Sequence, residues 1–162
     1  PKSPYAKTKL MAENFLTENY QDKSWILRLA PVYSKNIKFN IMRRTLFLNI
    51  PYIVNRGRYR LSLCNMKNIT HLVLAIINDE FSHGIYNISD KQSYSYLDLH
   101  QFNKSFNYII IPTFIIKVIF FIGKMLNKQF LIENSIKLIS DNIYPSDKVR
   151  NYKDLPHSLK EL

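Results

Sequence analysis

The chain has 162 residues, of which 46% are hydrophobic and 22% are charged. This length allows one ordinary domain, and the apolar content is sufficient for a buried core, so a wholly disordered chain is excluded. Lys and Arg number 23 against 12 Asp and Glu, and the resulting formal net charge of +11 favours an anionic partner. The single cysteine, Cys64, excludes an intrachain disulfide and a multi-cysteine zinc site, and it favours a reducing, intracellular compartment.

Glycine is scarce in this sequence. The three glycines, Gly57, Gly84 and Gly123, lie far apart, which excludes a glycine-rich phosphate-binding loop from these residues. The chain opens with Pro1 rather than Met and enters a helical pattern at once, without a basic and apolar leader. We therefore expect a fragment of a longer fold and no secretory signal.

The first half of the sequence alternates between helical and strand-like patterns. Ser3 and Pro4 provide an N-cap followed by proline at the first helical position, which predicts a helix over residues 4–19. The short apolar run 25–29 is stopped by Pro31 and predicts a buried strand. The elements predicted next in chain order are a helix within 37–50, strands at 52–54 and 61–64 around a turn at 55–58, and an amphipathic helix over 67–78.

The second half of the sequence is richer in helical patterns. Residues 84–88 predict a strand, and Ser95 is the expected N-cap of a helix that continues to Phe106. Further helices are predicted over 131–139 and 146–152. The order of elements indicates a mixed α/β protein with its helices concentrated at the end.

The nearly continuous apolar run 108–126 approaches the length of a membrane span. Pro112, Lys117 and Lys124 interrupt it, and a lysine near the middle of a spanning helix costs about 2.5–3.5 kcal/mol. We therefore expect a buried or interfacial helix here and no membrane span.

Tyr5 and Lys9 are the strongest candidates for catalysis. They lie four residues apart, so a helix places the phenol and the ammonium on one face. A tyrosine with its ordinary pKa of about 10 shuttles protons poorly at neutral pH, and a neighbouring cation favours the phenolate. Tyr5 could then act as a general acid or base; the alternative is an ordinary solvated helix face.

The residues around this pair extend the pattern. Pro4 precedes the tyrosine, Thr8 precedes the lysine, and Glu13 follows the lysine by four residues. This stretch resembles the active-site helix, Y-x-x-[ST]-K-x-x-x-E, of the extended short-chain dehydrogenase/reductases, the NAD-dependent nucleotide-sugar epimerase/dehydratase family. The segments similar to later parts of that family follow in the same order: 26–33, 61–69, 84–99, 137–138 and 147–162. The resemblance covers nearly the whole chain, but only the C-terminal half of the family pattern.

The resemblance implies the fold and the domain organisation. We expect the C-terminal portion of a Rossmann-like doubly wound α/β fold with a small mixed α/β substrate-binding region. Residues 1–34 would end the NAD(P)-binding domain and carry the active-site helix. Residues 35–162 would form mainly the substrate-binding region, with some elements returning to the Rossmann sheet. The implied protein is cytoplasmic, uses NAD or NADP, takes a nucleotide sugar as substrate and forms a homodimer at full length.

The resemblance also implies roles for individual residues. Tyr5 would exchange a proton with the sugar hydroxyl, and Lys9 would hydrogen-bond the nicotinamide ribose. The backbone near Pro31 and Val32 would face the nicotinamide. Arg60 would hold the sugar-nucleotide diphosphate, as a guanidinium suits that group; the alternative is a solvated arginine near a turn. Ser34 stands where the family usually has glycine, so its tight turn must be made in another way.

Other functions stay open beside this one. The chain could be a non-catalytic, truncated remnant that lacks the cofactor-binding half, or a basic nucleic-acid-binding domain. The latter needs its positive charge on one face, whereas the lysines are scattered through every predicted element. Epimerase, dehydratase and reductase activities are equally compatible with the sequence. The four histidines lack metal-ligand spacing, and Cys64 fits a small core residue better than a nucleophile.

Overall fold

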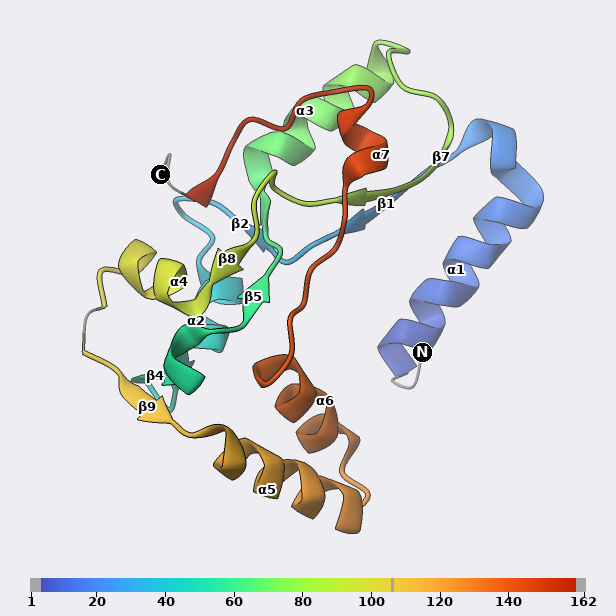
Figure 1. Ribbon diagram of the computed structural model, residues 1–162. Coiled ribbons are helices and arrows are strands. Elements are labelled where there is room, and N and C mark those ends of the chain that lie inside the picture. The colour runs from blue at the N-terminus through green and yellow to red at the C-terminus, as the bar shows by residue number, and fades with distance from the viewer. Residues whose placement is uncertain (1–3, 106, 160–162) are drawn as a thin grey trace.

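The computed structural model describes residues 4–105 and 107–159 (Figure 1). The N-terminal elements are α1 (Pro4–Tyr20), the 3-10 turn η1 (Gln21–Lys23), β1 (Trp25–Leu29), β2 (Val32–Tyr33), α2 (Phe39–Thr45), β3 (Leu46–Phe47), β4 (Ile50–Val54) and η2 (Asn55–Gly57). The elements that follow are β5 (Arg60–Leu61), β6 (Cys64–Asn65), α3 (Met66–Ile77), β7 (Gly84–Ile88), β8 (Tyr94–Ser95), α4 (Tyr96–Phe102), β9 (Ile109–Ile111), α5 (Thr113–Met125), α6 (Gln129–Leu138) and α7 (Asp147–Arg150).

One end of the molecule is built on parallel strands. β1 pairs with β7 from Trp25 opposite Gly84 to Leu29 opposite Ile88, and β2 pairs with β6 in the same sense. Figure 1 shows α3 and α7 beside these strands, with α1 standing apart from them. A hydrophobic cluster joins the strands to α3, α7 and the C-terminal segment: Ala30, Cys64, Leu72, Ala75, Phe81, Tyr86, Ile88, Val149 and Leu155.

The other end contains short mixed sheets and the last long helices. β4 lies between antiparallel β3 and parallel β9, and β5 pairs with β8 in antiparallel fashion. A second buried cluster lies between α2, α4 and these strands: Tyr33, Ile41, Ile53, Leu61, Leu63, Tyr94, Tyr96, Leu99 and Leu159. The chain is thus mixed α/β, as the order of sequence patterns indicates.

Helices α5 and α6 form a hairpin that packs closely at Gly123. A Cβ at Gly123 would lie 2.9 Å from Leu131 Cβ, so only glycine allows this approach. Only Ile116 and Gly123 of α5 are buried. No helix within the described residues combines the length and the apolar content needed to cross a bilayer.

Several predicted elements are confirmed. α1, β1, β7 and α3 match the predicted positions closely. Ser95 caps α4: its hydroxyl accepts from the Asp98 backbone N–H, and the Asp98 carboxylate accepts from the Ser95 N–H. The proposed N-cap Ser3 and the predicted helix end at Phe106 lie outside the described residues.

Other predicted elements are wrong in extent or type. The helix within 37–50 ends at Thr45, because Leu46 and Phe47 turn back and pair with Pro51 and Ile50. The apolar run after residue 108 begins with a strand, β9, since Pro112 separates it from α5. The predicted strand 61–64 is split into β5 and β6, and α4 ends earlier, at Phe102. The last helix is shorter than predicted, Asp147–Arg150. Strand β1 is half-buried to exposed, whereas a buried strand was predicted.

Candidate functional site

The structure places Tyr5 and Lys9 together on an exposed face of α1. Lys9 Nζ lies 5.8 Å from the centroid of the Tyr5 ring, as the spacing of four residues predicts. The Tyr5 side chain is 73% exposed, and none of residues 4–20 is buried. Within the described residues the Tyr5 hydroxyl has no hydrogen-bond partner, so both functional groups are open to an external molecule.

An ion pair attaches α1 to the first strand. Arg28 of β1 donates from Nε to Glu13 Oε2 over 3.0 Å and also contacts Glu13 Oε1 through Nη2. The hydrogen bond from Arg28 lowers the pKa of Glu13 and raises the pKa of the guanidinium. The glutamate that completes the sequence pattern therefore orients the helix that carries Tyr5 and Lys9.

Pro31 lies in the connection between β1 and β2, and Val32 is the first residue of β2. Both residues are half-buried, and both carbonyls are occupied: Pro31 accepts from the Cys64 backbone N–H over 3.1 Å, and Val32 accepts from Asn40 Nδ2 over 2.9 Å. The turn that follows uses the Ser34 hydroxyl, which accepts from the N–H groups of Asn36 and Ile37. Ser34 is not among the residues with positive φ, so this turn does not need glycine there, and the hydroxyl stabilises it.

Arg60 lies on β5 at a small cavity. Its guanidinium donates from Nε to Ser93 Oγ over 2.9 Å and from Nη2 to the Ser93 carbonyl. A cavity of about 270 Å³ opens beside it, lined also by Tyr94, Asp98 and Phe102. Arg60 is therefore positioned by Ser93 but still exposed at the edge of a concave surface.

A buried carboxylate, Asp90, connects strands and helices that are far apart in the sequence. Oδ2 accepts from the hydroxyls of Tyr33 (2.6 Å) and Tyr94 (2.8 Å). Oδ1 accepts from the Asn65 backbone N–H (2.7 Å) and from Asn68 Nδ2 (2.9 Å). Burial raises the pKa of Asp90, and these four bonds oppose the rise. Burial also raises the pKa of Tyr33 above its ordinary value and that of Tyr94 to about 12.

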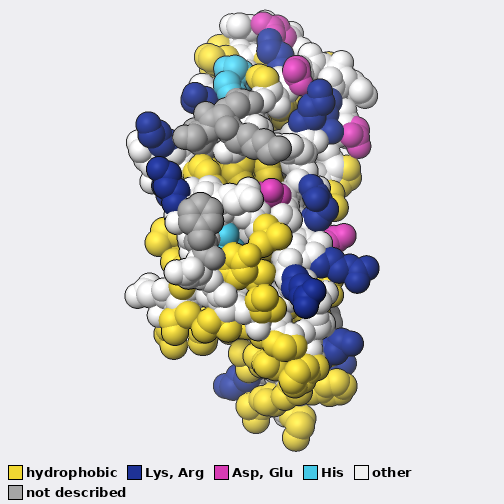
Figure 2. Space-filling model, turned by 60° about the vertical axis from the view of Figure 1, so that its left-hand side comes forward, with side chains coloured by type: hydrophobic (Ala, Val, Ile, Leu, Met, Phe, Trp, Pro, Cys, Tyr) yellow, Lys and Arg dark blue, Asp and Glu magenta, His cyan; other side chains and the backbone are white. Residues whose placement is uncertain are grey.

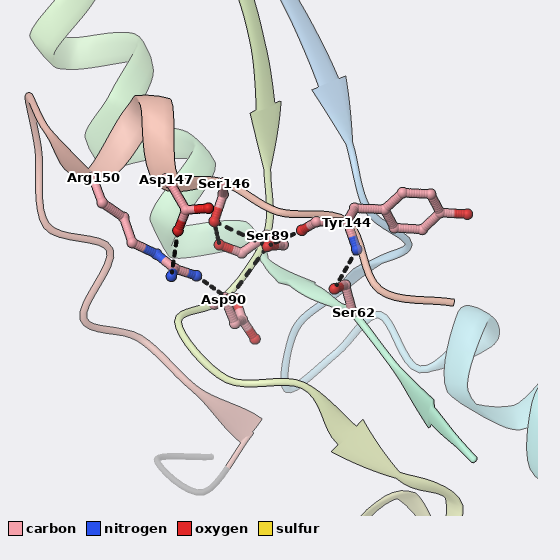
Figure 3. A network of polar contacts seen from close by, with 7 residues as sticks. All are labelled: Ser62, Ser89, Asp90, Tyr144, Ser146, Asp147 and Arg150. Carbon is pink, nitrogen blue, oxygen red and sulfur yellow. Dashed lines mark hydrogen bonds and ion pairs between the residues drawn. The ribbon is translucent and has the colours of Figure 1, made fainter. Parts of the chain in front are cut away.

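A second layer of polar contacts fixes the backbone around Asp90 (Figure 3). Ser89 Oγ donates to the Tyr144 carbonyl and lies 3.1 Å from Ser146 Oγ. Arg150 Nη2 donates to the Asp90 carbonyl over 3.0 Å, and Arg150 also pairs with Asp147. These contacts hold the end of β7 against the C-terminal segment. Sequence reasoning missed this cluster; its only signal was Asp90 directly after a strand.

The structure brings some of the sequence candidates together and leaves others apart. Tyr5 and Lys9 share a face, and Pro31 and Val32 are adjacent, but no hydrogen bond or ion pair within the described residues links either pair with Arg60. Cys64 is buried, and burial raises its pKa to about 12, as expected for a core residue. Among the described residues, no three His, Cys, Asp or Glu side chains gather as metal ligands would.

Comparison with known proteins identifies the fold. No protein-family model matches the sequence, and no curated protein matches it. The structure of ADP-L-glycero-D-manno-heptose-6-epimerase from Helicobacter pylori is similar, with a TM-score of 0.63 and 14% identity over 99% of this chain and 48% of that chain. UDP-glucuronic acid 4-epimerase from Bacillus cereus, solved in complex with NAD, is similar with a TM-score of 0.59 and 17% identity over 98% of this chain and 49% of that chain.

The chain therefore spans about half the length of these epimerases. It has the fold of the C-terminal part of the Rossmann-like epimerases, which is the fold expected from the sequence resemblance.

Proposed function

We propose that this chain is the part of an NAD(P)-dependent nucleotide-sugar epimerase, dehydratase or reductase that carries the active-site helix and the substrate-binding region. The main support is structural similarity: 98–99% of this chain superposes on about half of each of two sugar-nucleotide epimerases. The exposed Tyr5 and Lys9 pair supports the same reading, because it leaves a phenol and a cation free on one face. In this proposal residues 1–34 belong to the cofactor domain and residues 35–162 mainly to the substrate-binding region.

The described residues fit only one end of a dinucleotide. Tyr5 and Lys9 are exposed, and Pro31 and Val32 are half-buried, so together they suit the nicotinamide and its ribose. Pyrophosphate binding in this architecture uses a glycine-rich turn at a helix N-terminus, which the three separated glycines cannot form. NAD or NADP, when bound, supplies or accepts the hydride; the proposal assigns its pyrophosphate site to residues outside this sequence.

Tyr5 moves the proton in the proposed chemistry. Its Oη takes the proton of a sugar hydroxyl as the carbon that bears it loses hydride, and it returns the proton to the carbonyl oxygen in the reverse direction. Lys9 orients the nicotinamide ribose and places positive charge beside the phenolate, which accepts the proton in one direction and is left behind in the other. Glu13 and Arg28 act as positioning residues, because they hold α1 against β1.

Arg60 binds the anionic part of the substrate in this proposal. A guanidinium matches the oxygens of a diphosphate; Ser93 occupies the Nε and Nη2 donors of Arg60, so Nη1 and the second Nη2 hydrogen would face the ligand at the edge of the cavity. Nucleotide-sugar binding would then use β5 and β8, which lie in the substrate-binding region.

The substitution Tyr5→Phe tests the proposal in the whole protein, with its cofactor-binding half present. It keeps the ring and removes the transferred proton, so we expect kcat to fall by about 10²- to 10⁴-fold on a sugar nucleotide. Tyr20→Phe is the matched control, since Tyr20 is also an exposed tyrosine of α1, and it should leave kcat unchanged. Full turnover in the Tyr5→Phe protein would refute the role of Tyr5. Absence of any sugar-nucleotide turnover in the parent protein would favour the non-catalytic alternative.

A further inference from the structure

Helix α5 exposes a wide apolar face opposite the face that it buries. Ile116 and Gly123 are buried against β4 and α6. At about 100° per residue, the exposed apolar side chains occupy a sector about 120° wide that contains no polar side chain. The residues in this sector are Phe114, Ile115, Val118, Phe121, Ile122 and Met125. The face is thus far more apolar than the solvent-facing side of an ordinary surface helix.

This surface continues beyond α5. Leu126 and Phe130 are also exposed, and we call them, together with the six α5 residues, the apolar tip. Figure 2 shows hydrophobic side chains gathered at one end of the molecule, where they bulge outward rather than line a hollow. Met125 is 85% exposed and Phe130 is 75% exposed. A surface that protrudes offers no groove into which a peptide segment could fit. It suits better a partner that can deform around it.

The charged side chains on α5 and in the connection to α6 are all lysines, and the first acidic residue after them, Glu133, lies one turn beyond Phe130 on α6. Lys117 and Lys124 lie at one edge of the apolar sector, and Lys128 follows the helix. The sequence contains no Asp or Glu between Asp98 and Glu133. Lys124 Nζ lies 4.9 Å from the ring centroid of Phe120, which is half-buried and flanks the apolar sector on the side of the lysines.

We propose that the apolar tip docks on an anionic lipid bilayer. Helices with a broad apolar face, aromatic residues on it and lysines at its edge lie in the membrane interface, with the apolar face at the boundary between headgroups and acyl chains. The lysines would meet the lipid phosphates, where each basic residue adds to the attraction. This contact is a surface attachment and not a span, and it does not depend on the proposed enzymatic function.

Two other occupants fit the apolar tip less well. A second copy docked on the same surface would bring the lysines of both chains together, in a protein whose net charge is already +11. The cofactor-binding half that the proposed function requires would join at β1 and α1. Figure 1 shows α5 at the end of the molecule opposite α3 and α7, away from β1.

Vesicle flotation tests this proposal on the 162-residue chain and on the whole protein that carries it. We expect both to float with vesicles in which about a third of the lipid is phosphatidylglycerol, and not with pure phosphatidylcholine. The double substitution Phe121→Asp with Met125→Asp should weaken binding by at least about tenfold. Replacing Lys117, Lys124 and Lys128 with Gln should weaken it by a similar factor.

Ile77→Asp is the matched control. Ile77 is 68% exposed on α3, at the other end of the molecule, so this variant should float like the parent. Circular dichroism checks that all the variants fold, as exposed positions allow. Parent protein that stays with the lipid-free fractions would overturn the proposal. A dimer that the Phe121 and Met125 substitutions dissociate, without vesicle binding, would also overturn it and identify a second copy as the occupant.

Discussion

Asp90 shows how one buried side chain organises this fold. Its two oxygens accept four hydrogen bonds, from Tyr33, Asn65, Asn68 and Tyr94. Those donors belong to β2, β6, α3 and β8, so the carboxylate joins elements that meet only in the folded chain. Buried charge is costly, and a full set of donors is the usual compensation.

Removal of the Asp90 carboxylate should lower the stability of the fold. Asp90→Ala leaves the hydroxyls of Tyr33 and Tyr94 and the Asn65 N–H buried without their acceptor. An unsatisfied buried donor costs about 1–3 kcal/mol, so we expect the free energy of unfolding to fall by at least about 2 kcal/mol in urea titrations. Asp154→Ala, at an exposed aspartate, is the control and should change stability little. Equal stability of the two variants would show that Asp90 is not a structural centre.

Alkaline pH should destabilise the fold through its buried tyrosines. Burial raises the pKa of Tyr96 to about 12, whereas an unfolded tyrosine titrates near its ordinary value of about 10. The unfolded state therefore loses this proton first, so the stabilisation is complete below about pH 10 and is lost as the pH rises towards 12. Urea midpoints measured between about pH 9 and 11 should fall less steeply for Tyr96→Phe than for the parent. The exposed Tyr20→Phe variant should follow the parent curve, and an identical slope for Tyr96→Phe would contradict the assignment.

At the scale of elements, α1 is the longest helix of the described residues, yet it is weakly anchored. None of its residues is buried, and the Glu13–Arg28 pair ties it to β1. Most of the stability of a helix in a protein comes from the packing of its apolar face, and α1 has little such packing. The proposed catalytic pair therefore lies on a helix that, within the described residues, is tied to β1 by a surface ion pair and buries none of its side chains.

Glu13→Gln should loosen α1 without unfolding the rest. Surface ion pairs contribute about 0.2–1 kcal/mol, so we expect faster amide exchange in α1 and unchanged exchange in α3. Arg28 lowers the pKa of Glu13, so the pair stabilises above the ordinary glutamate pKa and is lost as the pH falls through the lowered value. Glu18→Gln, on the same helix, is the control. Equal protection of α1 in both variants would remove the anchoring role of Glu13.

The sequence predicted well those elements that begin or end at a residue with a specific local role, such as a capping serine or a proline. Ser95 places the start of α4 through its capping box, and Pro31 limits the strand before it. The hairpin at Leu46 was missed because its turn residues, Leu48 and Asn49, both have positive φ, which leucine seldom adopts. Helical spacing continued across this turn, so the pattern favoured a helix.

The residues of the candidate site also differ in how far they could be predicted from the sequence. Tyr5 and Lys9 were predictable because their contact is local, four residues apart on one helix. The Asp90 cluster was not predictable, because Tyr33 and Tyr94 lie far apart in the sequence and meet only when β2 and β8 are folded together. Sequence periodicity contains no information on such distant pairing.

At the scale of the whole molecule, the parallel sheet is narrow and incompletely covered. β1 and β7 form a two-stranded sheet, and Leu29 at the end of β1 is 44% exposed. Parallel sheets are ordinarily buried on both faces by helices. The exposed strand and the sparsely packed α1 lie next to each other along the chain, and in the proposed function the cofactor-binding half would cover both.

If the proposed function holds, cofactor binding is the property that should separate this chain from a longer protein that contains it. Dinucleotide affinity in this architecture comes largely from backbone N–H groups and the helix dipole at a glycine-rich turn. None of Gly57, Gly84 and Gly123 lies between a strand and a helix in the required spacing. We expect Tyr5, Lys9 and Pro31 to offer too little surface to hold NAD without such a turn, so calorimetric titration of the 162-residue chain should show no saturable binding of NAD or NADP up to about 1 mM. The protein with a glycine-rich half restored should bind one of them and transfer hydride. Saturable binding by the isolated chain would place a dinucleotide site within these residues, and the division of the fold proposed here would then be wrong.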